Sequence, residues 1–167
     1  MNERLLYVMA QLDQDTCEKM KAIDRLLFEM GIEVKKPPKT PYHITLGSFE
    51  LEKEEEVKRR LDEICAKVPR FPLTYNHIGL FGLKVLFFGP DVNEHLLALQ
   101  KPFEDIRINE HDWTAHTTLM MDEPEGILKA LPVVAEKFSN FHATVDSVSL
   151  YEYWPPRMIC EHRLGGG

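Results

Sequence analysis

The pattern His-x-Thr-Leu occurs twice in the sequence, and this repetition restricts the folds that the chain can adopt. The first copy begins at His43 in the stretch PYHITLGSF, and the second begins at His116 in the stretch TAHTTLMM. In an extended strand, residues i and i+2 project to the same face of a sheet. Each copy therefore predicts a strand, near 42–49 and near 115–121, that presents His and Thr on one face.

The same order of elements follows each copy of the pattern, at an offset of 73 residues between His43 and His116. Hydrophobic spacing predicts a helix after each copy, then a long strand, a turn and a short strand. We therefore expect an α+β fold in which residues 1–167 form one two-lobed domain with an internal repeat. Mainly antiparallel sheets flanked by helices should enclose a central cleft in this pseudo-symmetric fold, and the motif strands should meet across it.

The other elements are predicted from the same periodicities. A helix that Asp13 or Asp15 caps should run to about Met30 and end at Gly31. The remaining predictions are a strand at 4–11, a proline-rich loop at 35–41, a helix at 51–68, strands at 71–80 and 84–89, a helix at about 91–106 that Pro102 kinks or divides, a helix near 125–138 that Pro132 interrupts, and strands near 141–151 and 157–164.

Composition and charge narrow the possible functions. The net charge of −7 argues against an extended nucleic-acid-binding surface, which needs many Lys and Arg contacts, but it allows a short nucleotide. No apolar run is long enough to span a membrane, and the first ten residues show no signal-peptide pattern. The three widely spaced cysteines predict reduced thiols in a cytoplasmic protein. We expect a monomer, with residues 165–167 as a tail.

Two strands of this kind facing each other would line the cleft with two imidazoles, from His43 and His116, and two hydroxyls, from Thr45 and Thr118. This set suits phosphodiester chemistry. One histidine can remove a proton from the attacking oxygen while the other protonates the leaving oxygen. The hydroxyls can donate to phosphate oxygens as charge builds in the transition state. The scheme requires no cofactor and no metal.

Other interpretations of the histidines are weaker. A lone histidine on a strand is more often a structural residue than a catalyst, but two copies at equivalent points of a repeat favour a working pair. A zinc site is the chemical alternative, with His43, His116 and a third ligand such as His77. Zinc leaves the paired threonines unexplained.

Several further residues are candidates for substrate binding. Tyr42, Trp113 and Phe81 could stack on a base, although packing in the core is the simpler interpretation for Tyr42 and Trp113. Arg157 or Lys84 could supply positive charge from neighbouring strands.

The paired motifs, their spacing and the alternating elements resemble the two-histidine (2H) phosphoesterase superfamily, and within it the bacterial branch known as 2′-5′ RNA ligase or RNA 2′,3′-cyclic phosphodiesterase. The resemblance extends from the first strand to about Arg163 and includes the stretches FPLTYNHIGLFG and KVLFFG between the motifs. It implies that His116 activates water, that His43 protonates the leaving oxygen, and that Thr45 and Thr118 bind the phosphate.

The resemblance implies a metal-independent phosphoesterase that acts on 2′,3′-cyclic phosphate or 2′-5′ phosphodiester bonds of small nucleotides or RNA ends. Ligation through a 2′-5′ bond would be the reverse of the same chemistry. One position departs from the bacterial branch, which commonly has arginine where this chain has Met121. The alternative is a nucleotide-binding module of the same fold with little turnover.

Overall fold

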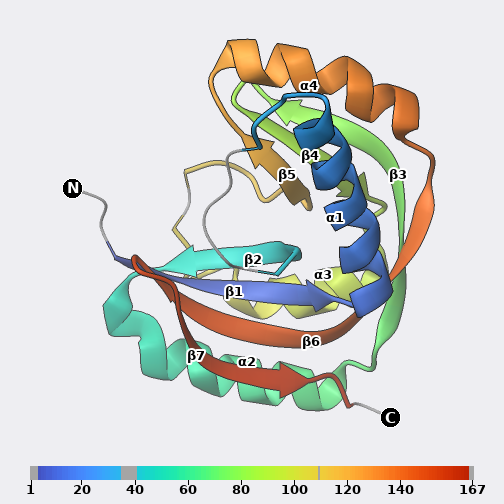
Figure 1. Cartoon of the computed structure of the whole chain (residues 1–167). Coiled ribbons are helices and arrows are strands. Elements are labelled where there is room, and N and C mark those ends of the chain that lie inside the picture. The colour runs from blue at the N-terminus through green and yellow to red at the C-terminus, as the bar shows by residue number, and fades with distance from the viewer. Residues whose placement is uncertain (1–3, 35–40, 109, 166–167) are drawn as a thin grey trace.

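A computed structural model describes residues 4–34, 41–108 and 110–165 of the chain (Figure 1). The strands are β1 (Leu5–Leu12), β2 (His43–Phe49), β3 (Phe71–Phe81), β4 (Val85–Pro90), β5 (Thr117–Met121), β6 (Phe141–Tyr153) and β7 (Arg157–Arg163). The helices are α1 (Gln14–Glu29), α2 (Glu54–Lys67), α3 (Glu94–Gln100) and α4 (Pro124–Lys137), with short 3-10 helices η1 (Leu51–Lys53) and η2 (Lys101–Phe103).

The seven strands form one antiparallel sheet in the order β2-β1-β6-β3-β4-β5, and β7 also pairs with β6. The pairing has a repeated pattern, because the set β2-β1-β6 has its counterpart in the set β5-β4-β3. The two sets are joined where the first part of β3, Phe71–Tyr75, pairs with the first part of β6, Phe141–Val145. The prediction of a mainly antiparallel α+β fold is confirmed.

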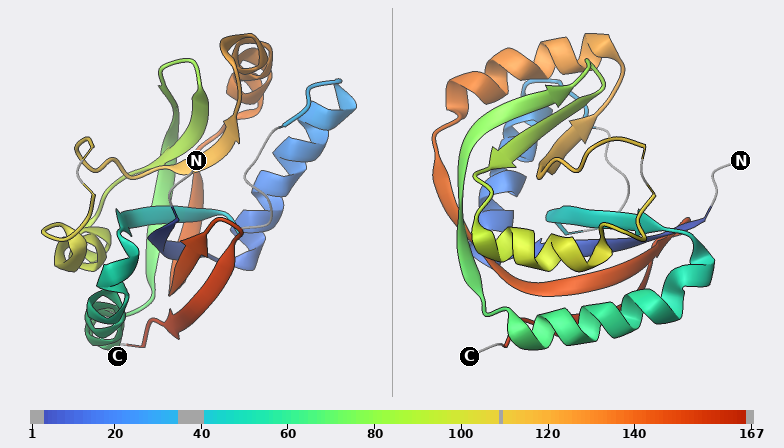
Figure 2. Two further views of the ribbon diagram at one scale, coloured as in Figure 1. Left: turned by 90° about the vertical axis from the view of Figure 1, so that its left-hand side faces the viewer. Right: turned by 180° about the vertical axis from the view of Figure 1, so that it is seen from behind.

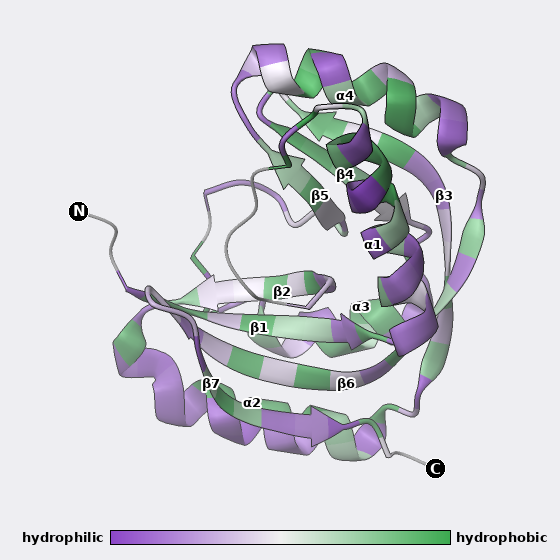
Figure 3. Cartoon of the chain, in the orientation of Figure 1, coloured by the Kyte–Doolittle hydropathy of each residue, from purple (hydrophilic) through white to green (hydrophobic). Residues whose placement is uncertain are grey.

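Helices cover the outer faces of this sheet, as the two views of Figure 2 show. Helices α2 and α3 pack beside the β2-β1-β6 set, and α4 packs against β4. Helix α2 is largely hydrophilic in Figure 3, and its buried residues Val57, Leu61 and Cys65 recur at a spacing that keeps them on one face. Apolar residues on the helix-covered side of the strands, such as Leu6 and Leu150, are fully buried.

Helix α1 begins and ends where the sequence predicts. The Asp13 carboxylate caps it by accepting hydrogen bonds from the Thr16 backbone N–H, at 2.9 Å, and from the Thr16 hydroxyl. The same carboxylate accepts a bond from the Thr144 backbone N–H of β6, at 2.7 Å. At the other end, Gly31 adopts a φ of +78°, which a residue with a side chain rarely tolerates.

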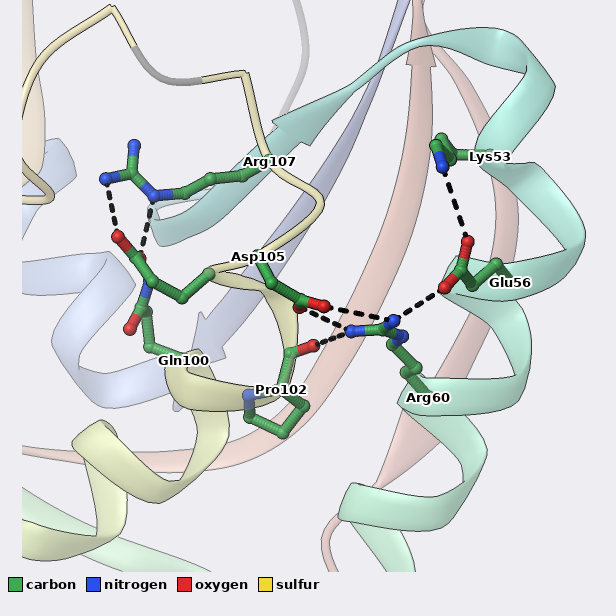
Figure 4. A network of polar contacts seen from close by, with 8 residues as sticks. Lys53, Glu56, Arg60, Gln100, Pro102, Asp105 and Arg107 are labelled. Atoms are coloured by element: carbon green, nitrogen blue, oxygen red, sulfur yellow. Dashed lines mark hydrogen bonds and ion pairs between the residues drawn. The ribbon is translucent and has the colours of Figure 1, made fainter.

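The segment after α3 is tied to α2 by the network drawn in Figure 4. The Arg60 guanidinium donates to the Pro102 carbonyl and to the Asp105 carboxylate, each at 2.6 Å, and also pairs with Glu56 of its own helix. Arg107 pairs with Glu104 and donates to the backbone carbonyl of His111, at 3.1 Å. These contacts fix the path of the chain toward the second motif.

The two prolines predicted to disturb helices have different effects. Pro102 divides its helix, because α3 ends at Gln100 and the single turn η2 follows. The prediction that Pro132 interrupts its helix was wrong, since α4 is continuous through it. Pro132 lies on the exposed side of α4, where water can replace the backbone hydrogen bond that proline removes.

Two predictions fall wholly or partly outside the described residues. The predicted proline-rich loop spans positions 35–41, and of these only Pro41, which is exposed, is among the described residues. Of the predicted tail, only Gly165 is described; its backbone N–H donates to the Cys65 carbonyl at 3.4 Å.

The Asp13 cap provides a test of the fold. We expect Asp13→Ala to lower the free energy of unfolding by about 1–2 kcal/mol, because the N-terminal amide of α1 and the Thr144 amide both lose their acceptor. The matched control is Asp15→Ala in the first turn of the same helix, which should change it by less than about 0.5 kcal/mol. Urea denaturation of both variants measures the difference, and equal effects would contradict the cap.

Candidate active site

The two motif strands, β2 and β5, are the two ends of the sheet order, and they contact each other. The sheet therefore curves until β2 and β5 approach each other, and Figure 1 shows β5 above β2. This curvature brings the two motifs close together, although His43 and His116 are 73 positions apart in the sequence.

The alternation predicted for the first motif is present in β2. His43 and Thr45 are half-buried on one face of the strand, whereas Ile44 and Leu46 are fully buried in the core. The two polar residues each have a partner on β1 that shares their face, since His43 pairs with Gln11 and Thr45 pairs with Met9.

The second motif repeats this arrangement. His116 immediately precedes β5, and both His116 and Thr118 are half-buried. Thr117 points the other way and is buried, with its hydroxyl 2.7 Å from the phenol oxygen of Tyr75. Thr117, which lies between His116 and Thr118, therefore connects β5 to the middle of β3.

The leucine of each motif has a role that the sequence analysis did not assign. In β2 the register shifts between Thr45 and Gly47, so Leu46 is an extra residue in a β-bulge. In β5 the register shifts between Thr118 and Met120, so Leu119 is the extra residue there. A bulge changes which face the following residues take. The only sign of these bulges in the sequence was the leucine that directly follows His-x-Thr in both copies.

The two imidazole rings are held in the same way. The Nδ1 atom of His43 lies 2.7 Å from the Pro41 carbonyl oxygen, and the Nδ1 atom of His116 lies 2.7 Å from the Thr114 carbonyl oxygen. A carbonyl oxygen can only accept, so Nδ1 carries the hydrogen in both rings. The Nε2 atom of each neutral ring is therefore the unprotonated nitrogen, available to accept a proton.

Burial lowers the pKa of both imidazoles below the usual value of 6.5, and it outweighs the opposing effect of the backbone hydrogen bonds. The charge of His116 lowers the pKa of His43 further. The nearby charge of His111 has the same effect on His116. Within the described part of the chain, no lysine, arginine or carboxylate contributes to either shift.

Aromatic rings surround His116, and one of them was predicted as a candidate. The Phe81 ring packs edge-on against the imidazole with a centroid distance of 4.7 Å, and the Phe87 ring lies at 5.4 Å. Phe87 occupies the space above Gly79, where an added Cβ would lie 2.3 Å from its ring. The glycine thus makes room for the Phe87 ring beside the histidine, with the two ring planes inclined at 59°.

Trp113 and Tyr42 are half-buried and pack against the core, which is the simpler of the two interpretations considered for each. The Trp113 indole N–H donates to the Thr45 carbonyl at 2.9 Å, so the segment before the second motif is attached to the first motif strand. The Tyr42 hydroxyl donates to the Asp24 carboxylate on α1. Trp113 is thereby a positioning residue between the two motifs.

The structure does not place Arg157 beside the two histidines. Arg157 pairs with Glu152 across β7 and β6, and its guanidinium donates to that carboxylate at 2.6 Å. Glu152 in turn pairs with Leu6, whose side chain is in the core on the helix-covered face, so Arg157 lies on the opposite face from His43. Lys84 is exposed and lies 3.9 Å from Glu123.

The histidine named as a possible third metal ligand has a different environment. The His77 ring lies over Gly89, where an added Cβ would be 2.0 Å from its Nε2 atom. Among the residues that the structure describes, no three His, Cys, Asp or Glu side chains are grouped so that they could hold a metal ion.

The described residues include no helix long and apolar enough to cross a membrane.

Comparison with known families assigns the chain. The sequence model of the 2′-5′ RNA ligase superfamily matches residues 18–154. The chain belongs to this superfamily. The identification of a 2H phosphoesterase from the paired motifs is confirmed, and membership supports an enzyme with phosphoesterase or ligase chemistry.

Solved structures show the same fold over nearly the whole length of this superfamily member. LigT of E. coli in its apo form has a TM-score of 0.67 at 17% identity, covering 98% of this chain and 99% of LigT. TT0787 of Thermus thermophilus has a TM-score of 0.67 at 14% identity, covering 96% of this chain and 97% of that protein. A search of curated protein sequences finds no match.

The histidine environments predict a measurable acid sensitivity. We expect both imidazoles to titrate below pH 6.5 in ¹H–¹⁵N NMR spectra, because burial disfavours the charged form. The unfolded chain then binds more protons than the folded one below about pH 6.5, so the free energy of unfolding falls as the pH falls through this range. The double variant His43→Ala/His116→Ala should lose less stability between pH 7 and pH 5, and a larger loss would contradict the assignment.

Proposed function

We propose that the protein is a metal-independent phosphoesterase that cleaves a 2′,3′-cyclic phosphate or a 2′-5′ phosphodiester bond by His/His acid–base catalysis. One observation carries the proposal. His43 and His116 lie on facing edges of one sheet, and each has its Nδ1 atom bonded to the carbonyl two residues earlier, which leaves both Nε2 atoms for the substrate.

The chemistry begins with one neutral ring and one protonated ring, the state that mutual repulsion between the histidines favours. With a cyclic phosphate, the Nε2 atom of His116 takes a proton from water, and the water oxygen forms a bond to phosphorus. The bond from phosphorus to one ribose oxygen breaks, and that oxygen receives the proton of His43. The Thr45 and Thr118 hydroxyls donate to the phosphate oxygens, and the same sequence with a 5′-hydroxyl in place of water as the attacking group gives ligation.

A small nucleotide or an RNA end fits the surroundings of the histidines better than a long nucleic acid. Phe81 packs against His116, Phe81 pairs with Val85, and Val85 pairs with Met121, so an apolar rim extends from His116 toward the far end of β5. Such a rim suits a nucleobase rather than a charged backbone. LigT has been crystallised in complexes with 3′-AMP and with phosphate, which supports a ligand of this size.

The proposal is tested by incubating the protein with 2′,3′-cyclic AMP and with a 2′-5′ dinucleotide in the presence of EDTA. We expect turnover that persists in EDTA and falls by at least about 100-fold in His43→Ala and in His116→Ala, since each variant removes one proton transfer. His142→Ala is the matched control, because this exposed histidine contacts Thr74 of β3 and should be dispensable.

The other outcomes of this experiment are equally informative. Activity that disappears with EDTA would sink the metal-free mechanism. Tight binding of 3′-AMP without turnover of either substrate would favour the nucleotide-binding module, an alternative that the absence of arginine at Met121 keeps open.

The pH dependence of kcat/KM provides a second test, because it reports the pKa values of the free enzyme. The reaction needs one neutral and one protonated histidine, and both imidazoles have pKa values lowered from 6.5. We therefore expect a bell-shaped profile whose maximum lies below about pH 6.5. A profile that rises continuously to pH 9 would instead indicate that a protonated histidine is not required.

A further inference from the structure

Gln11 is a buried polar side chain without a partner. Only 7% of the residue is exposed, and neither its Nε2 nor its Oε1 atom has a hydrogen-bond partner among the residues that the structure describes. Burying an unpaired amide costs about 1–3 kcal/mol, so such groups are rare in folded proteins and require an explanation. Gln100 is the natural comparison, because it is 6% exposed and donates to the Glu104 carboxylate.

The position of Gln11 connects it to the proposed site. It lies directly opposite His43 in the pairing of β1 with β2, so the two side chains share the cleft face of the sheet. Side chains paired in this way have Cβ atoms about 4.5–5.5 Å apart, well within the length of a glutamine. The Gln11 amide can therefore reach the space that the Nε2 atom of His43 faces.

The neighbours of Gln11 on this face already have partners. The Nδ1 atom of His43 donates to the Pro41 carbonyl, and the hydroxyl of Ser147, which pairs with Gln11 from β6, donates to the Glu161 carboxylate at 2.9 Å. The Gln11 amide therefore remains unpaired beside the first motif, next to the free Nε2 atom of His43.

We propose that Gln11 is a further substrate-binding residue, whose Nε2 atom donates a hydrogen bond to a phosphate oxygen of the substrate on the His43 side of the site. This inference rests on the proposed function, since it assumes a phosphate between the two histidines. It supplies a neutral donor in a site where no lysine or arginine acts on either imidazole within the described residues.

The equivalent position in the second half of the described chain is occupied differently. Met9 pairs with Thr45 and Phe87 pairs with Thr118, so the position two residues further along each strand is Gln11 in β1 and Gly89 in β4. The His77 ring occupies the space beside Gly89. An amide therefore lies next to the first motif where an imidazole lies next to the second, which makes the two histidines unequal in a site whose motifs are alike.

A pair of matched variants separates substrate binding from a structural role. We expect Gln11→Met to keep or raise the melting temperature, because it removes an unpaired amide, while lowering kcat/KM for 2′,3′-cyclic AMP by about 10- to 100-fold. It should also weaken the thermal stabilisation produced by 3′-AMP. Gln100→Met should do the opposite, with kcat/KM unchanged and a melting temperature about 2–4 °C lower, because it breaks an existing hydrogen bond.

The results distinguish this proposal from the proposed function. If the wild-type protein turns over the cyclic nucleotide and Gln11→Met has the same kcat/KM and the same response to 3′-AMP, the role of Gln11 is overturned. A melting temperature of Gln11→Met that falls as far as that of Gln100→Met would also overturn it, since Gln11 would then have a partner within the protein. If there is no turnover but 3′-AMP still stabilises the wild type more than Gln11→Met, the proposed function fails and the binding role stands.

A charged variant tests the position of the side chain independently of turnover. Gln11→Glu places a carboxylate beside His43 and should raise the pKa of that imidazole in NMR titrations. The same variant should bind 3′-AMP more weakly than Gln11→Met, because a carboxylate repels the phosphate. An unchanged titration of His43 would show that the side chain does not face the ring.

Discussion

The pairing of β3 with β6 is the constraint on which the remaining structure depends. Each of these long strands follows one half of the sequence repeat but completes the sheet of the other half, since β3 pairs with β4 and β6 pairs with β1. Neither half can therefore finish its own three-stranded set. The junction holds the two sets at the angle that lets β2 and β5 meet, and Tyr75 at this junction bonds to Thr117 of the second motif. The site is thus a product of the whole chain.

Features that depend on neighbours in the sequence could be predicted well. The alternation of His43, Ile44 and Thr45 assigned one face to the cleft and one to the core, and their burial agrees. The cap at Asp13 and the left-handed glycine that ends α1 are equally local. To predict that the two motifs face each other, the 73-residue repeat was also needed, because strand periodicity alone does not show which strands approach each other.

Features that depend on register could not be predicted. Arg157 was a reasonable candidate by charge, yet its pairing with Glu152 places it on the helix-covered face, and that pairing depends on a register shift between Leu150 and Tyr151. Gln11 was overlooked because a glutamine at the end of an apolar strand has no distinctive pattern. Its partner across the sheet, His43, is known only once β1 and β2 are aligned.

The bulges at Leu46 and Leu119 have a consequence for the protein as a molecule in solution. The strands that carry the motifs are also edge strands of the sheet, and an exposed, regular edge invites another chain to add a strand. An extra residue in each edge interrupts the evenly spaced row of backbone donors and acceptors that an incoming strand needs. The recurring leucine therefore connects the proposed site with solubility, because the irregularity beside each proposed phosphate ligand also makes that edge a poor template for aggregation.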